Sequence, residues 1–427
     1  MKSFSKQARP IGVDLFAGAG GLSLGFEQAG FDVAAAIEID PVHCATHEFN
    51  FPRTTTLCAN VTNLTGDIIR SRSSIGSADI DVVFGGAPCQ GFSMMGRRAL
   101  DDPRNQLVGH YVRLVHELQP KFCVFENVKG LTLGKHVKFL DELIETLENS
   151  GYSVLLPYRV LNAADFGVPQ DRRRLFLVAA RRGMPLPSYP EEESKRVTVW
   201  DAIGDLPDAD SFDDLLDCDS VATHWGATSR YAQRMRSLAV DSSNFGYNRK
   251  HDENCLTSSL RTVHSPLSKL RFATTQAGDT EAVSRFHKLD PGGQCNTLRA
   301  GTDSARGAFT SPRPIHPTLP RVITVREAAR LHSYPDWFRF HKTKWHGFRQ
   351  IGNSVPPLLA RAVAGEIMKA LGRSPRKPEE ILQQGHPELL TYDMGAAARR
   401  FRVPHDVIAQ RTRKTVEKCP ELEFTGA

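Results

Sequence analysis

The chain has 427 residues, 40% hydrophobic and 24% charged, which is the composition of an ordinary globular protein with room for two or three domains. A formal charge of +6 and a pI near 8.9 mildly favour an anionic partner. Neither a signal peptide nor a run of about eighteen apolar residues occurs, so export and membrane insertion are not expected. Eight cysteines without a C-x-x-C pair or zinc-like spacing indicate a reduced protein without a metal site.

Short apolar runs alternate with amphipathic segments in the first part of the chain. Strands are expected at 11–16, 33–37, 81–84, 122–125 and 175–179. Helices are expected between them at 22–28, 106–118 and 138–149, where apolar residues recur every three or four positions. Strands that alternate with helices form parallel sheets with right-handed crossovers. The sequence therefore predicts an α/β fold with a doubly wound, mostly parallel sheet.

The pattern changes near residue 185, where several prolines interrupt the chain. Positions 186–220 carry eleven acidic and two basic residues, whereas 221–322 carry fourteen basic and seven acidic residues. The basic part is suited to phosphates, although a charge run is as often an ordinary solvated surface. Helical patterns resume at 324–340 and 356–371.

A glycine-rich segment, DLFAGAGG at 14–21, connects the first strand to the first helix. Glycines at this place let the backbone approach a nucleotide-type ligand closely. Ser23 stands where dinucleotide enzymes carry their third glycine, so the motif differs from theirs. Glu38 closes the second strand and is placed to accept hydrogen bonds from ribose hydroxyls. Together they predict an adenosine-containing cofactor, the alternative being that the glycines serve only a tight turn.

Cys89 and Glu126 each follow an apolar strand, so both side chains are expected at the same sheet edge as the glycine loop. A cysteine flanked by proline and glycine in a loop is a candidate nucleophile, although an isolated cysteine is more often a small buried apolar residue. Arg172 and Arg174 precede the strand at 175–179 and share one face of it. They either reach the same site or form the solvent face of an edge strand.

Six sequence blocks, in this order, resemble those of the prokaryotic DNA (cytosine-5) methyltransferases. They are DLFAGAGG at 14–21, GGAPCQGFS at 85–93, ENV at 126–128, QDRRR at 170–174, REAARL at 326–331 and QIGNSVPP at 350–357. The resemblance covers 11–180 and 323–371. It implies a Rossmann-like sheet that binds S-adenosyl-L-methionine, with a smaller target-recognition domain inserted.

The resemblance also implies a division of the chain. Residues 1–185 would form the catalytic domain, 186–340 the target-recognition domain, 341–372 a helix that returns to the catalytic domain, and 373–427 a C-terminal extension. Within the extension, 395–413 has the look of a helix-turn-helix with arginines for phosphates. The alternative is an amphipathic tail packed on the rest of the protein.

Cytosine C5 is too weak a nucleophile to take a methyl group directly, and the family solves this by covalent catalysis. The cysteine matching Cys89 adds to C6, and the glutamate matching Glu126 hydrogen-bonds N3 and the exocyclic amine. Arg174 matches an arginine that contacts the base, and Arg172 is expected to support the same loop. The base must leave the DNA stack to reach these groups, and 90–104 resembles the loop that closes over it.

The same comparison assigns the cofactor contacts. They are Phe16, Gly18, Gly20, Glu38, Ile39, Asn60, Pro88, Asn353 and Val355. Asn60 departs from the family pattern, which usually has an aspartate there. Its amide oxygen can still accept from an adenine amino group, but without a charge.

The expected partner is double-stranded DNA, and a cognate restriction endonuclease would act on the same site without a stable complex. The protein would be a monomer in the bacterial cytoplasm, associated with the nucleoid and not with a membrane. Two alternatives use the same residues: a tRNA cytosine-5 methyltransferase, which would lack the long recognition domain, and a catalytically silent DNA-binding regulator. A nicotinamide oxidoreductase would leave Cys89, Glu126 and the arginines without roles.

Overall fold

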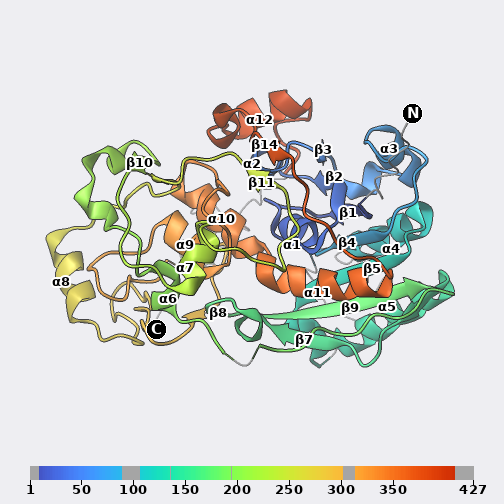
Figure 1. Ribbon diagram of the computed structural model, residues 1–427, viewed down its shortest axis with the longest axis horizontal. Coiled ribbons are helices and arrows are strands. Elements are labelled where there is room, and N and C mark those ends of the chain that lie inside the picture. Colours follow the sequence, from blue (N-terminus) through green and yellow to red (C-terminus); the bar gives the residue numbers. More distant parts are fainter. Residues whose placement is uncertain (1–8, 89–105, 135, 194, 302–312, 409–427) are drawn as a thin grey trace, which may run out of the picture.

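The computed structural model describes residues 9–88, 106–134, 136–193, 195–301 and 313–408 (Figure 1). Its centre is an eight-stranded sheet in the order β3-β2-β1-β4-β5-β9-β6, with β7 also paired to β9. The strands are β1 (Ile11–Leu15), β2 (Asp32–Glu38), β3 (Thr55–Cys58), β4 (Val82–Gly85), β5 (Phe122–Val128), β6 (Tyr152–Val154), β7 (Arg159–Asn162) and β9 (Arg173–Arg181). The first five are parallel to one another, which confirms the predicted doubly wound, mostly parallel fold.

Strand β9 departs from the parallel arrangement. It runs antiparallel to β5, β6 and β7. A parallel strand would carry the arginines that precede it to the opposite edge of the sheet. Because β9 is reversed, Arg174 instead pairs with Val128 at the end of β5. The reversal therefore brings the QDRRR segment to the edge where the glycine loop lies.

Helices cover both faces of the sheet, since alternate residues of each buried strand point to opposite sides. The helices of this part are α1 (Gly21–Ala29), α2 (Pro41–Asn50), α3 (Gly66–Ser71), α4 (Gln106–Leu118) and α5 (His136–Asn149). One apolar cluster joins α1 to Phe84 and Phe122 of the sheet. The other joins α4 and α5 to Val83 and Phe125, the neighbouring residues on the same strands.

The part of the chain that follows β9 has little sheet. Its helices are α6 (Val199–Ile203), α7 (Arg230–Met235), α8 (Pro266–Thr274), α9 (Val325–Leu331), α10 (Lys344–Asn353), α11 (Pro357–Ala370) and α12 (Met394–Phe401). Two-residue strands pair as β8 (Gln170–Asp171) with β13 (Cys295–Asn296), β10 (Val221–Ala222) with β12 (Cys255–Leu256), and β11 (Asn248–Arg249) with β14 (Ile381–Leu382). Short 3-10 helices lie at Val61–Asn63, Lys129–Thr132, Ala163–Phe166, Ala209–Ser211, Asp213–Leu216 and Pro387–Leu390.

The single helix predicted at 324–340 is wrong beyond Leu331. His332 ends α9, and Ser333 has a left-handed backbone with φ of 63°. Pro335 follows two residues later and disfavours a helical residue before it. The aromatic residues that come next, Phe338 and Phe340, pack as irregular chain in the core.

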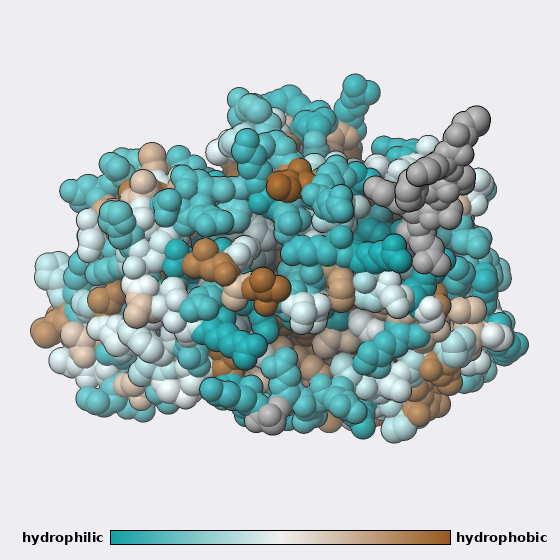
Figure 2. All heavy atoms as spheres, viewed as in Figure 1, coloured by the Kyte–Doolittle hydropathy of each residue, from teal (hydrophilic) through white to brown (hydrophobic). Residues whose placement is uncertain are grey.

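Helix α11 returns the chain to the sheet and lies directly against α1 (Figure 1). A methyl group on Gly25 of α1 would come 2.3 Å from Cβ of Ala360, so this crossing requires a glycine. The extension then crosses α2, where β14 and α12 lie (Figure 1). The face in Figure 2 is mainly hydrophilic with scattered hydrophobic residues. Over the described ranges, no helix combines the length and apolar character needed to span a bilayer.

Candidate active site

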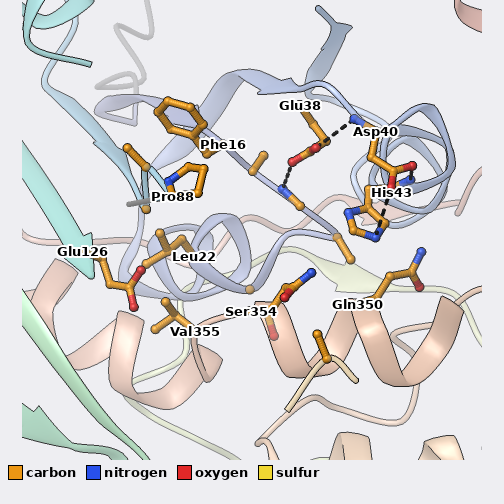
Figure 3. A pocket seen from close by; sticks show the side chains of 18 of the residues that line it. Phe16, Leu22, Glu38, Asp40, His43, Pro88, Glu126, Gln350, Ser354 and Val355 are labelled. Atoms are coloured by element: carbon orange, nitrogen blue, oxygen red, sulfur yellow. Dashed lines mark hydrogen bonds and ion pairs between the residues drawn. The ribbon is translucent and has the colours of Figure 1, made fainter. Parts of the chain in front are cut away.

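A cavity of about 930 Å³ lies at the carboxyl ends of β1, β2, β4 and β5 (Figure 3). Its lining contains most of the site residues predicted from the sequence, namely Phe16, Gly18, Glu38, Ile39, Asn60, Pro88, Glu126, Arg172, Arg174, Asn353 and Val355. Gly20 does not line it, although its neighbour Gly21 does. Cys89 and the loop at 90–104 lie outside the described residues, and the chain leading to them ends at the exposed Pro88.

The glycine loop forms one wall of the cavity in a conformation that few residues adopt. Phe16, directly after β1, has φ of 68°, and Gly18 has φ of 56°. A bulky residue at positive φ is strained, and such strain is typical of ligand sites. No heavy atom lies within 4 Å of a Cβ built on Gly18. The backbone at Gly18 is therefore open to a ligand in the cavity.

Gly20 has a different reason to be glycine. Its φ is 103°, and a Cβ there would come 2.3 Å from the ring of Phe51. It precedes the first residue of α1 and lets the loop pack against Phe51. The contact predicted between Gly20 and a cofactor is thus replaced, in this structure, by a packing contact.

Glu38 is held rigidly at the end of β2. One carboxylate oxygen accepts from the N–H of Gly18 at 2.8 Å, and the other accepts from Ile39 and Asp40 at 2.9 Å each. These bonds tie the second strand to the glycine loop (Figure 3). A carboxylate offers about four acceptor sites, so room is left for a ligand hydroxyl.

Asn60 lies on the same wall and caps the short helix Val61–Asn63. Its amide oxygen accepts from the N–H of Thr62 at 3.0 Å. An amide oxygen has two lone pairs, so one can still meet a donor in the cavity. The substitution of asparagine for aspartate keeps the local cap and removes a negative charge from the wall.

Glu126 lies at the other end of the cavity, near Leu22 and Val355 (Figure 3). It is 8% exposed, and its carboxylate is 3.1 Å from Nε of Arg174. Burial raises the pKa of Glu126 above its usual value, against the opposing effect of Arg174 and Arg172. A Cβ on Gly86 would come 2.5 Å from the carboxylate. The strand that leads to Cys89 therefore touches Glu126 directly and needs a glycine to do so.

Arg172 has a positioning role. Its side chain is 1% exposed and donates to three backbone carbonyls, those of Leu298, Gly352 and Ser354, at 2.8 Å each. These carbonyls belong to two distant segments of the chain. Arg172 thus joins the QDRRR segment to the stretches that carry Asn353 and Val355, while Arg174 is the arginine that reaches Glu126.

Three lining residues on α2 and α10 escaped prediction from the sequence. Asp40 caps α2 by accepting from Val42 at 3.0 Å, and Arg349 of α10 donates to it at 3.2 Å. His43 is 4% exposed, and its Nε2 has no hydrogen-bond partner among the described residues. Burial opposes it, but His43 and Arg349 hold the pKa of Asp40 below its usual value. A Pro-Val after an aspartate is a helix-start signal that could have revealed α2.

Two further lining residues, Val407 and Ile408, come from the C-terminal extension. Of the two helices predicted there, the first is confirmed as α12. The described part of the second, 406–408, is not helical. Prediction from sequence had no signal for this contact, because the extension matches none of the motifs.

Comparison with known proteins gives a consistent result. The family model for "C-5 cytosine-specific DNA methylase" matches residues 12–369. Type II methyltransferase M.XorII of Xanthomonas oryzae pv. oryzae is 64% identical over 412 residues, covering 96% of this chain and 97% of that protein. Type II methyltransferase M1.HphI of Haemophilus parahaemolyticus is 37% identical and covers 84% of this chain and 86% of its own.

A solved structure is similar as well. The crystal structure of a putative DNA modification methyltransferase encoded within an E. coli prophage superposes with a TM-score of 0.71 at 35% identity. The match covers 85% of this chain and 100% of that one.

Proposed function

The chain belongs to the C-5 cytosine-specific DNA methylases and is a type II DNA (cytosine-5) methyltransferase, and from this premise we propose how its own residues carry out the reaction. The substrate is a cytosine in a specific double-stranded DNA sequence, extruded from the helix into the cavity. The observation that carries the proposal is the buried Glu126, paired with Arg174 and touching the strand that leads to Cys89.

The cavity fits S-adenosyl-L-methionine at the end opposite Glu126. Gly18 leaves space for a ligand, and the fixed carboxylate of Glu38 has acceptor capacity for ribose hydroxyls. Phe16 and Ile39 offer apolar surface to adenine, with Asn60 beside them. The N-terminus of α1 suits a carboxylate. When bound, the cofactor supplies an electrophilic methyl group.

At the Glu126 end, the chain provides the groups that activate cytosine. The raised pKa of Glu126 favours the protonated carboxyl, which can donate to N3 while its second oxygen accepts from the exocyclic amine. Arg174 holds that carboxyl in place. Negative charge that develops on the ring is thereby offset where it forms.

Cys89 is the proposed nucleophile. Its thiolate forms a bond to C6, and the electron pair of the 5,6 double bond makes C5 nucleophilic. After C5 is methylated, loss of the C5 proton restores the double bond and expels the Cys89 thiolate. The loop at 90–104 closes over the flipped base. Residues 186–340 would read the DNA sequence, and the protein would act as a monomer beside a cognate restriction endonuclease in the bacterial cytoplasm.

The test is expression in a host without cytosine methylation, followed by bisulfite sequencing of its DNA. The intact protein should produce 5-methylcytosine at one short recognition sequence. Cys89→Ala should abolish it, and Glu126→Gln should lower the rate by about a hundredfold or more. Arg173→Gln is the matched control, because Arg173 is exposed between the two functional arginines.

Two results would overturn the proposal. The first is an intact, folded protein that adds no methyl group to DNA, including the case in which it methylates only tRNA. The second is a Glu126→Gln variant with the rate of the intact protein, which would remove the role assigned to that carboxyl.

A further inference from the structure

We propose that the C-terminal extension is part of the cofactor site, with Val407 and Ile408 completing its wall and holding S-adenosyl-L-methionine in place. This rests on the proposed function, in which that cofactor occupies the cavity. The extension lies beyond residues 12–369, the part shared with the family. The inference therefore assigns a role that the family motifs do not carry.

The extension is packed onto α2 by an apolar contact. Leu389 and Leu390 of the extension form a buried cluster with Ala45 and Phe49 of α2, and Phe401 of α12 lies against it. The residues facing one another are 5% exposed or less in the four that form the cluster. Burial of this kind is the main source of stability for a surface helix. It means that α12 occupies a defined place on α2.

Polar contacts fix the same path at several points. The N–H of Gly385 donates to the carbonyl of Phe49 at 2.9 Å, and Lys342 donates through its N–H to the carbonyl of Leu390 at 2.8 Å. Arg400 pairs with Glu48 on the outer side of α2. The extension is thus held along its length by backbone and side-chain contacts.

Helix α2 also builds the cavity. It starts immediately after Glu38 and Ile39, and Asp40 and His43 in its cap and first turn line the wall. A segment fixed to α2 is therefore fixed relative to the cavity. The same helix is the support for both.

The chain turns after α12 and enters the wall. Arg402 ends the helix with φ of 57°, and the N–H of Val403 donates to the carbonyl of Ala398 at 3.0 Å. A second turn is closed by the N–H of Val407, which donates to the carbonyl of Pro404 at 3.1 Å. Residues 404–406 are exposed, whereas Val407 and Ile408 are half-buried and line the cavity. The two apolar side chains thus face inward and the polar His405 and Asp406 face water.

Apolar side chains at this place have two effects on a bound nucleoside. They remove part of its apolar surface from water, which strengthens binding. They also cover a section of the opening through which the cofactor leaves, so we expect the main change in the dissociation rate. Both effects apply to S-adenosyl-L-methionine and to the demethylated product alike.

The test is calorimetric measurement of S-adenosyl-L-methionine and S-adenosyl-L-homocysteine binding to the full chain and its variants. Val407→Ala with Ile408→Ala should weaken both affinities by roughly tenfold, the effect of a few methyl groups in an apolar pocket. His405→Ala with Asp406→Ala, on the exposed part of the same turn, is the matched control and should bind as the intact protein does.

Two truncations test the segment without relying on point substitutions. A chain ending at Ile408 should keep the full affinity, whereas one ending at Val403 should lose it to the same extent as the double alanine variant. Equal affinity in the chain ending at Val403 and in the intact protein would overturn the inference. Loss of affinity already in the chain ending at Ile408 would also overturn it, because the binding would then depend on residues other than these two.

The outcome separates this inference from the proposed function. An intact protein that binds neither compound contradicts both. An intact protein that binds cofactor and methylates DNA, with unchanged affinity in the double alanine variant, contradicts the inference alone. Thermal unfolding without cofactor should show the same midpoint for the double alanine variant and the intact protein.

Discussion

The sheet region, 11–181, and the region from 199 to 341 fill their interiors with different kinds of side chain. In the sheet region large apolar residues pack on regular strands, as where Phe84 stacks on Phe26 with ring centroids 3.7 Å apart. In the later region arginines are among the largest fully buried side chains, and they bind carboxylates and backbone carbonyls of irregular chain. Few strands there supply ladder hydrogen bonds, so side chains must satisfy the buried carbonyls instead.

Two arginines of α9 illustrate the second arrangement. Arg326 is 1% exposed and donates to the carbonyls of Pro335 and Phe338, which follow the helix as irregular chain. Arg330 is fully buried and lies between Asp205 and Asp336, from two separate segments. The same solution appears once at the active site, where Arg172 binds three carbonyls. Buried arginines thus connect segments that no sheet connects.

The largest effect should come from breaking the arginine network. Arg330→Met would leave Asp205 and Asp336 without their partner in the interior, and we expect a loss of about 3–5 kcal/mol in unfolding free energy. Urea denaturation measures it. Adding Asp205→Asn and Asp336→Asn should recover much of the loss, because the uncompensated charge is then gone. A single variant as stable as the intact protein would show that the network does not stabilise this region.

The matched change in the sheet region is slightly smaller. Phe84→Ala removes a fully buried ring that stacks on Phe26 and leaves a cavity, which costs about 3–4 kcal/mol. Phe84→Leu should cost much less, since it retains most of the volume. In urea denaturation, equal losses for alanine and leucine would mean that the stacked geometry, and not filled volume, is what matters here.

The smallest effect concerns acid, and both regions share it. Burial lowers the pKa of His47 in the sheet region to about 3 and that of His316 in the later region to about 4. The unfolded chain takes up a proton near pH 6.5, so the stability present above that pH is lost as the pH falls toward these values. Each histidine should contribute a slope of about 1.4 kcal/mol per pH unit.

Urea midpoints at pH 7.5 and 5.5 give this slope. His47→Gln and His316→Gln should each reduce the loss between the two pH values by roughly 1.4 kcal/mol, whatever their effect at pH 7.5. A loss identical to that of the intact protein in either variant would show that the histidine concerned is already protonated in the folded state.

The sequence by itself was enough to predict most of the sheet region. Strands at 33–37 and 122–125 and the helix at 106–118 have strong periodicity, and the structure has them as β2, β5 and α4. Helix α2 was missed because its inner face carries polar residues such as Thr46 and His47, which interrupt the apolar pattern. With it were missed Asp40 and His43 in the cavity wall.

Motifs also predicted which residues gather at one sheet edge, because strand ends of a parallel sheet meet there. Glu38, Glu126 and Arg174 all line the same cavity, while the roles assigned to them stay predictions. Cys89 lies outside the described residues, so the structure adds nothing on its geometry.

Tertiary structure alone decided three things. It reversed β9, which brings Arg174 to Glu126. It gave Gly20 a packing contact with Phe51 and gave Arg172 three carbonyls from remote segments. It also placed Val407 and Ile408 in the cofactor wall. Local patterns in a sequence report neighbours along the chain, whereas each of these contacts joins residues far apart in it, and their pairing is set only when the whole core packs.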